Sequence, residues 1–261
     1  MTANGEATLM EMARAERADL AAFLATLTPQ QWDTPSLCVG WSVKDVVAHM
    51  ISYEELGTMR LIRRFVKGRI VRANEVGVDE FAPLSPRQLI EFLRNHLTPH
   101  GLTAGFGGMI ALVDGTIHHQ DIRRALGQPR TIPADRLGRV LGLVPGNPRL
   151  GAGRRIRGLR LRANDIDWAH GHGPEVTGTG EALLMAMSGR PAALADLAGP
   201  VTPPWLHGWV IARPSDRSAQ LGRISTVNSW LPMRMRSPSA RVALPRIRCC
   251  CTSTPFVDFE S

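Results

Sequence analysis

The residues with the clearest chemical potential lie in "VDGTIHHQDIRRALG", residues 113–127. At about 100° per residue of an α-helix, Asp114 and His118 lie one above the other on one face, whereas His119 points away from them. Asp121 lies one turn beyond His118, where it can orient the imidazole or bind a neighbouring helix. A carboxylate beside an imidazole offers two ligands to a divalent metal ion. The spacing therefore indicates part of a metal site.

A third ligand must come from another element, because catalytic metal sites usually have three protein ligands and an open position. His49 in "VKDVVAHMISYE" is the best candidate, since it borders an apolar helical stripe formed by Val43, Val46, Val47 and Met50. The residue pattern also allows a plainer interpretation, in which the histidines are packed, hydrogen-bonded residues that hold no ion.

The elements that must position these residues are four amphipathic helices, expected over residues 6–27, 43–67, from Ser85-Pro86 to about residue 97, and over 109–126. Ser42 with Asp45 forms a weak relative of the capping box before the second helix, and Gly127 ends the fourth. Four successive helices suggest a bundle.

The pattern changes after "QPRTIP". A short helix is expected near residues 134–143, followed by the linker "VPGNPRLGAGRR". "IRGLRLRAND" and "DIDWAHGHG" predict strands, and "EALLMAMSGRPAALADLAG" predicts one or two helices. The glycines of "GHGPEVTGTGE" match no phosphate-binding motif and are interpreted as turns. We therefore expect an α+β fold: an up-down helical bundle over residues 6–128, a linker over 129–155, a small α/β module over 156–212 and an irregular basic tail over 213–261.

Composition limits the possible functions. Half of the net charge of +8 lies in the tail, where residues 215–261 carry seven arginines against three acidic residues, and the rest is spread thinly; only 5% of all residues are aromatic. This argues against specific nucleic-acid binding. No apolar run of about 18 residues and no signal peptide is evident, so a soluble, cytoplasmic protein is expected. Cys38 stands alone and Cys249, Cys250 and Cys251 are consecutive, a spacing that fits a reducing compartment rather than a disulfide framework.

Three motifs occur in the order typical of one protein family. "WDTPSLCVGWSVKDVVAHM", "DGTIHHQDIRRALG" and "DIDWAHGHGPEVTGTGEALLMAMSGRPAALADLAG" resemble the mycothiol-dependent maleylpyruvate isomerase family, whose members pair a DinB-like helical bundle with a sterol-carrier-like module. The resemblance implies that His49, Asp114 and His118 hold a divalent ion, expected to be Zn²⁺, with water in the open position. Asp114 departs from the pattern, because relatives often have glutamate there, and the shorter side chain affects metal affinity or ion identity.

The resemblance also implies a function. An ion in an open site lowers the pKa of a bound thiol, so a thiol cosubstrate, mycothiol in this family, becomes a thiolate at neutral pH. Addition of that thiolate to an electrophilic small molecule leads to an isomerase or an S-transferase. Two alternatives stay open: a hydrolase that uses the bound water, and a non-catalytic ligand-sensing or regulatory bundle. Neither a nucleic-acid nor a membrane partner is expected, and a homodimer is one assembly compatible with this interpretation.

The burial or exposure of a cysteine, two tryptophans and several arginines can also be predicted from the sequence. Cys38 is interpreted as a small buried packing residue rather than a nucleophile, since no histidine is fixed beside it in sequence. Trp32 and Trp41 are expected to pack their loop against the bundle. Arg190 and the arginines of "RRIRGLRLR" are interpreted as solvated surface in preference to a binding site for carboxylates.

Overall fold

The computed structural model describes residues 7–67 and 72–199. The predicted irregular tail, with the cysteine triplet, lies outside the described residues. Within them the elements are α1 (Leu9–Leu24), α2 (Pro29–Trp32), α3 (Val43–Ile51), α4 (Thr58–Lys67), α5 (Ala73–Phe81), α6 (Pro86–Asn95), η1 (Gly101–Ala104), α7 (Met109–Ala125), α8 (Ala134–Leu143), α9 (Ala152–Arg155), β1 (Arg160–Ala163), β2 (Ala169–Gly171), β3 (Glu175–Gly178), α10 (Gly180–Met187) and η2 (Pro191–Asp196).

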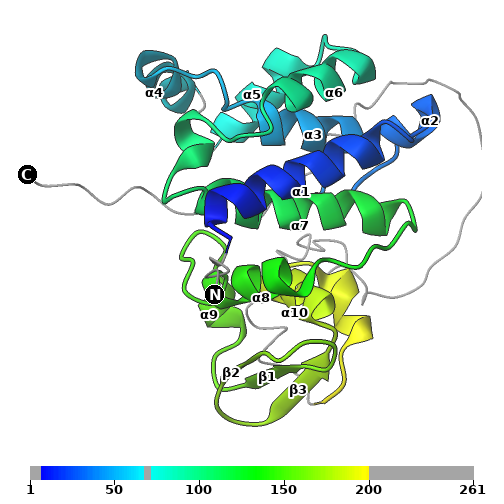
Figure 1. Ribbon diagram of the computed structural model, residues 1–261, viewed down its shortest axis with the longest axis vertical. Coiled ribbons are helices and arrows are strands. Elements are labelled where there is room, and N and C mark those ends of the chain that lie inside the picture. Colours follow the sequence, from blue (N-terminus) through cyan, green and yellow to red (C-terminus); the bar gives the residue numbers. More distant parts are fainter. Residues whose placement is uncertain (1–6, 68–71, 200–261) are drawn as a thin grey trace, which may run out of the picture.

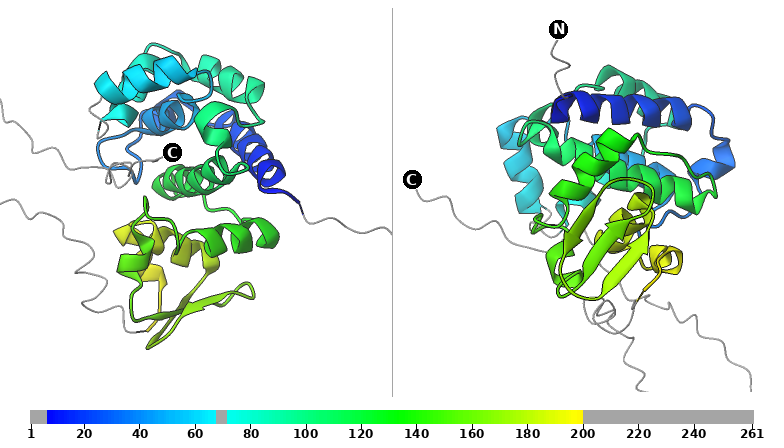
Figure 2. Two further views of the ribbon diagram at one scale, coloured as in Figure 1. Left: turned by 90° about the vertical axis from the view of Figure 1, so that its left-hand side faces the viewer. Right: turned by 60° about the horizontal axis from the view of Figure 1, so that its bottom comes forward.

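Helix α7 runs through the middle of the molecule, between two layers of helices (Figure 1). Helices α1 and α3 contact one side of α7, and α8 and α10 contact the other. The sheet lies beyond α8 and α10, on the side away from the bundle (Figure 2, left). The helix that carries Asp114 and His118 is therefore enclosed by both parts of the chain, and the predicted α+β class is confirmed.

Hydroxyl caps start the helices that shape the site. Ser42 accepts a hydrogen bond from the amide of Asp45, and the Asp45 carboxylate accepts one from the amide of Ser42. This reciprocal capping box confirms the predicted start of α3. Thr8 and Ser85 cap α1 and α6 in the same way.

The three-stranded sheet has the order β2-β1-β3, with β1 antiparallel to β2 and parallel to β3. Leu161 of β1 and Val176 of β3 are register partners and fully buried, because alternate side chains of both strands face α10. The sheet thus has one apolar face, which the two helices α8 and α10 cover.

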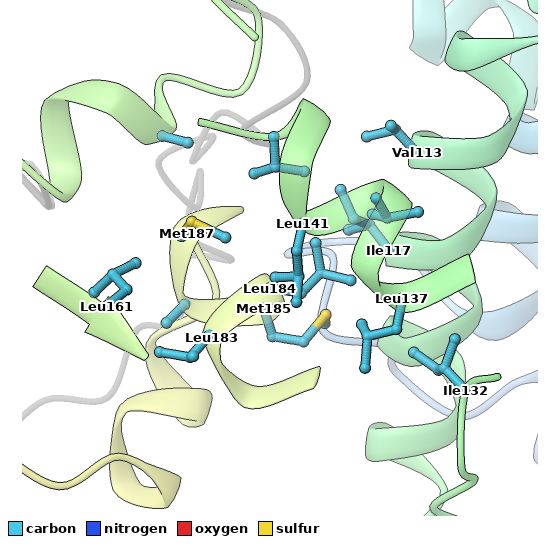
Figure 3. Packing of buried hydrophobic residues seen from close by; sticks show 14 of the residues in the cluster. Val113, Ile117, Ile132, Leu137, Leu141, Leu161, Leu183, Leu184, Met185 and Met187 are labelled. Carbon is cyan, nitrogen blue, oxygen red and sulfur yellow. The ribbon is translucent and has the colours of Figure 1, made fainter. Parts of the chain in front are cut away.

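Two hydrophobic clusters form the interior. One lies among α1, α3, α6 and the end of α7, and includes Leu20, Leu24, Val46, Leu89 and Ile122. The other joins α7 to the module, with Val113 and Ile117 of α7 beside Leu137 and Leu141 of α8 and Leu184 of α10 (Figure 3). The bundle and the module share this second core, so the segment expected to be a linker contributes α8 to it.

Some elements of the structure differ from those predicted. The helix expected over residues 43–67 is two helices, α3 and α4, and the chain turns back between them so that Arg64 donates to the backbone oxygen of Ser52. A further helix, α5, was not predicted, because its apolar periodicity is interrupted by Gly77. The segment of "GHGPEVTGTGE" interpreted as turns contains β3, whose parallel partner β1 is close in space but not adjacent along the chain.

The other predicted elements are confirmed. Helices α1, α6, α7, α8 and α10 lie where the periodicity placed them, and α7 ends next to Gly127, whose φ is +63°. Among the described residues, no helix is both long and apolar enough to cross a membrane.

Candidate metal centre

His49, Asp114 and His118 come together between α3 and α7. One ligand atom from each of the three lies within 4.8 Å of the others. The Asp114 carboxylate lies 3.4 Å from Nε2 of His118 and 3.8 Å from Nε2 of His49. The ring centroids of His49 and His118 are 5.0 Å apart, and the two ring planes are nearly perpendicular, at 86°. The expected side-by-side placement on α7, and the approach of His49 from another helix, are both as the sequence predicted.

The three side chains differ in exposure. Those of His49 and His118 are 6% and 1% exposed, whereas that of Asp114 is 39% exposed. The centroid of the tilted Trp41 ring lies 5.0 Å from that of His49. The Tyr53 ring is edge-on to the His49 ring, with 6.3 Å between their centroids. Among the described residues, the cluster is therefore enclosed on the histidine side and open to solvent at Asp114, so a small molecule can approach it at the Asp114 edge.

The other ring nitrogen of His118, Nδ1, is hydrogen-bonded to Asp121. Nδ1 of His118 lies 2.9 Å from Oδ2 of Asp121, whose side chain is fully buried. A carboxylate accepts hydrogen bonds, so Nδ1 carries the proton and donates it. This leaves Nε2 facing Asp114 as the nitrogen available to a metal ion. Asp121 thus orients His118, one of the two roles predicted for it.

Arg190, which follows α10 in the module, pairs with Asp121. Its Nε donates to Oδ1 at 2.8 Å and its Nη2 to Oδ2 at 2.5 Å. Both side chains are buried, at 5% and 0% exposure. The interpretation of Arg190 as solvated surface was wrong, because Asp121 is a buried carboxylate that requires a compensating charge.

Charges shift the protonation equilibria of this cluster. Burial opposes ionisation of Asp114, but His118 and His49 hold the pKa of its carboxyl well below the usual range, while solvent at its exposed edge screens part of this attraction. Burial also opposes the charged form of His118, yet Asp114 and Asp121 outweigh it and raise the pKa of His118 to about 10. Burial likewise disfavours the Asp121 carboxylate, and Arg190 and His118 keep the pKa of Asp121 low. These shifts therefore favour a protonated His118 imidazolium flanked by two ionised carboxylates.

Cys38 belongs to a second group with metal-ligating atoms, together with His118 and Asp121. The Cys38 thiol donates to Oδ2 of Asp121 at 3.1 Å and lies 3.5 Å from Nδ1 of His118. Nη2 of Arg190 approaches the same sulfur at 3.8 Å. A divalent ion at this place would lie beside a guanidinium cation in a buried environment and be repelled. The group that contains His49 is therefore the candidate metal site.

Cys38 itself was predicted in part. It is buried in the bundle core, as expected, and Trp32 and Trp41 pack its loop against the same core. The reason given for this role concerned the sequence alone, and in space the Cys38 sulfur does lie beside a histidine, His118. The contact joins residues 80 positions apart, so no local sequence pattern predicts it.

His119 faces away from the candidate metal site, as its position on the helix predicted. Nδ1 of His119 donates to Oε1 of Glu16 at 2.8 Å, and Nε2 accepts from Nε of Arg123 at 2.9 Å. Burial, together with the nearby arginines, lowers the pKa of His119 despite Glu16. Its two ring nitrogens are thus used in a separate network between α1 and α7.

Fold and site together define an α+β protein whose helical bundle carries a candidate site of two histidines and one carboxylate. Residues 13–99 match the family model of the mycothiol maleylpyruvate isomerase N-terminal domain. The resemblance seen in the motifs is confirmed for this stretch, which is about a third of the chain. His49 lies inside the matched residues, whereas Asp114 and His118 follow them.

Two solved structures are similar to the chain. They are the crystal structures of the mycothiol-dependent maleylpyruvate isomerase and of a histidine-to-alanine mutant of it, at 13% and 14% sequence identity. Each similarity covers 78% of this chain and 98% of the other, with a TM-score of 0.45. A comparison with curated proteins finds no match.

Proposed function

We propose that this protein is a divalent-metal-dependent enzyme that uses mycothiol as a thiol cosubstrate and adds it to an electrophilic small molecule, as an isomerase or an S-transferase. The observation that carries the proposal is the convergence of His49, Asp114 and His118 from two helices into one cluster that is exposed to solvent at Asp114. The family of the N-terminal domain, named for a mycothiol-dependent isomerase, supports the thiol.

The donor set fits a divalent ion. Two imidazoles and one carboxylate are the ligands of many catalytic zinc sites, which keep a further position open. His49 and His118 would bind through imidazole nitrogens and Asp114 through a carboxylate oxygen. We propose Zn²⁺ as the ion because nitrogen donors dominate the set. A bound divalent ion supplies a lowered thiol pKa, so that the cosubstrate is a thiolate near neutral pH.

The protein side chains prepare this chemistry. Asp121 holds the Nδ1 proton of His118, so the imidazole presents Nε2 toward Asp114. His49 is packed against Trp41 and Tyr53, which restricts access of water from the bundle side. The exposed edge at Asp114 is where the thiol and the electrophile would enter. A cytoplasmic location, where a low-molecular-weight thiol is reduced, is part of the same proposal.

The test is turnover of a panel of electrophilic double-bond compounds by the metal-loaded protein with mycothiol. We expect product formation that depends on thiol, and that disappears in the metal-stripped protein and in His118→Ala. The loaded protein acting equally well without thiol would identify the hydrolase instead. A panel that never exceeds the metal-stripped control would contradict the enzymatic proposal and favour the ligand-sensing bundle.

A further inference from the structure

We propose that Arg190 is a positioning residue through which the C-terminal module holds His118 in its ligating orientation. The proposal rests on the proposed metal site and concerns a residue that does not belong to the ligand set. Three buried side chains contact one another in series: Arg190 contacts Asp121, and Asp121 contacts His118.

The first step is the attachment of Arg190 itself. Gly189, with φ +89°, lets the chain turn back after α10, and the amide of Arg190 donates to the oxygen of Met185. Nη1 of Arg190 donates to the oxygen of Ser188 at 2.6 Å. The guanidinium is thus fixed to the end of α10, and Nε and Nη2 are directed at Asp121.

The second step is the bidentate pair. Two parallel hydrogen bonds from one guanidinium fix both the place and the plane of a carboxylate, which one ammonium group does not do. With Oδ1 and Oδ2 both engaged by Arg190, the carboxylate of Asp121 is held with Oδ2 at 2.9 Å from Nδ1 of His118. The rotation of the His118 ring follows from the position of that oxygen.

A second set of ion pairs links α7 to the module without contacting His118. The same face of α7 carries Arg124, which donates to Glu181 of α10 and to Asp196 of η2. This ion pair joins the same elements as Arg190 and Asp121, but it does not touch His118. Arg124 therefore provides a matched control for the loss of an inter-element ion pair.

The test compares Arg190→Gln, Arg190→Lys and Arg124→Gln in the full chain, with two measurements. Zn²⁺ affinity is measured by competition with a chromogenic chelator. The ring N–H signals of ¹⁵N-histidine-labelled, metal-free protein report the Nδ1 proton of His118 directly. The Nδ1 proton of His119, held by Glu16 at 2.8 Å, is an internal reference in the same spectrum. His118→Ala assigns the signal by its loss.

We expect Arg190→Gln to weaken Zn²⁺ binding by about 10- to 100-fold, the usual effect of losing a group that orients a ligand. The His118 signal should shift or exchange away while that of His119 stays. Arg190→Lys keeps the charge and should give a smaller loss, which keeps the test informative where Arg190→Gln fails to fold. Arg124→Gln should match the parent in both measurements.

Equal affinity and an unchanged His118 signal in both Arg190 variants would overturn the inference. Equal losses in Arg124→Gln would also overturn it, because the effect would then belong to the interface in general. A parent protein that binds no Zn²⁺ would refute the proposed function instead, and the His118 signal of the metal-free variants would still decide for or against the positioning role.

Discussion

At the scale of single residues, neighbouring histidines on α7 have different partners because they point in different directions. His118 lies between Asp114 and Asp121, and its ring meets that of His49. His119 lies between Glu16 and Arg123. A substitution at one of them should therefore affect metal binding, and at the other the stability of the α1–α7 contact.

The first prediction concerns the ligands. His49→Ala and His118→Ala should each remove the ion from protein that otherwise retains about one ion per chain, because two remaining ligands hold a divalent ion far more weakly than three. Elemental analysis after identical handling, with circular dichroism for helicity, is the measurement. His172→Ala, at an exposed residue of the module, serves as the control. Metal content unchanged in both ligand variants would mean that the ion binds elsewhere.

The second prediction concerns pH. Burial opposes ionisation of Glu16, but His119 and Arg130 outweigh it and lower its pKa from 4.5 to about 2. A carboxyl with a depressed folded-state pKa stabilises the protein above its unfolded-state pKa, and this contribution is lost as the pH falls through the folded-state value. The contribution of Glu16 is therefore present at neutral pH, amounts to about 3 kcal/mol, and disappears between about pH 4.5 and pH 2.

Urea unfolding of the parent and of Glu16→Gln over this pH range checks the effect. The free energy of unfolding of the parent should fall by about 3 kcal/mol more than that of Glu16→Gln, which is less stable at neutral pH but has no carboxyl to titrate. Parallel acid dependences in the two proteins would show that Glu16 titrates normally in the folded state.

At the scale of elements, the start of α7 sets the position of its metal-ligating face. Gly108 has φ +95° and precedes the helix, next to α1. A Cβ at this position would lie 2.9 Å from Cα and 3.0 Å from the amide nitrogen of Met10. The close approach of α7 to α1 therefore requires a glycine, since the obstacle is backbone that cannot rotate away.

The third prediction follows from this contact. Gly108→Ala should lower the free energy of unfolding by about 2 kcal/mol more than Gly107→Ala. Gly107 also has a positive φ, +69°, but a Cβ there would meet nothing within 4 Å, so its substitution reports the backbone cost alone. Chemical denaturation of both variants measures the difference. An equal loss of unfolding free energy in the two variants would mean that α1 shifts to accommodate the Cβ at residue 108 without an energetic penalty.

At the scale of the whole molecule, the bundle and the module share one core. Leu184 of α10 is completely buried in the cluster that also contains Val113 and Ile117 of α7. Polar contacts of α7 with the module accompany this apolar interface, among them those of Gln120 and Arg124 with Glu181. A core that is continuous across both parts should make them unfold together.

The fourth prediction is a single cooperative transition. Far-ultraviolet circular dichroism, which follows the bundle helices, and tryptophan fluorescence should give coincident unfolding curves. Leu184→Ala should move both curves and cost about 2–5 kcal/mol. Ile62→Ala, at a residue of α4 that is 50% exposed, should change stability by less than about 0.5 kcal/mol. Separate transitions for the two probes would contradict the shared core.

The sequence by itself determined the local features of this protein. Period and capping residues located α1, α6 and α7, and the four-residue spacing put Asp114 and His118 on one face of α7. These features depend on residues within one or two turns of each other, so a linear pattern records them. The apolar stripe beside His49 indicated a residue near the bundle interior and made it the candidate third ligand, and the family motifs implied the same residue.

Only the tertiary structure decided the contacts between distant segments. The turn between α3 and α4 depends on Arg64 reaching back to Ser52, and β3 exists because β1 lies beside it. The pairing of Arg190 with Asp121 joins residues 69 positions apart, and Cys38 meets His118 across 80 positions. Such contacts leave no periodic trace in the chain, because they arise when separate elements pack and a buried carboxylate requires a cation.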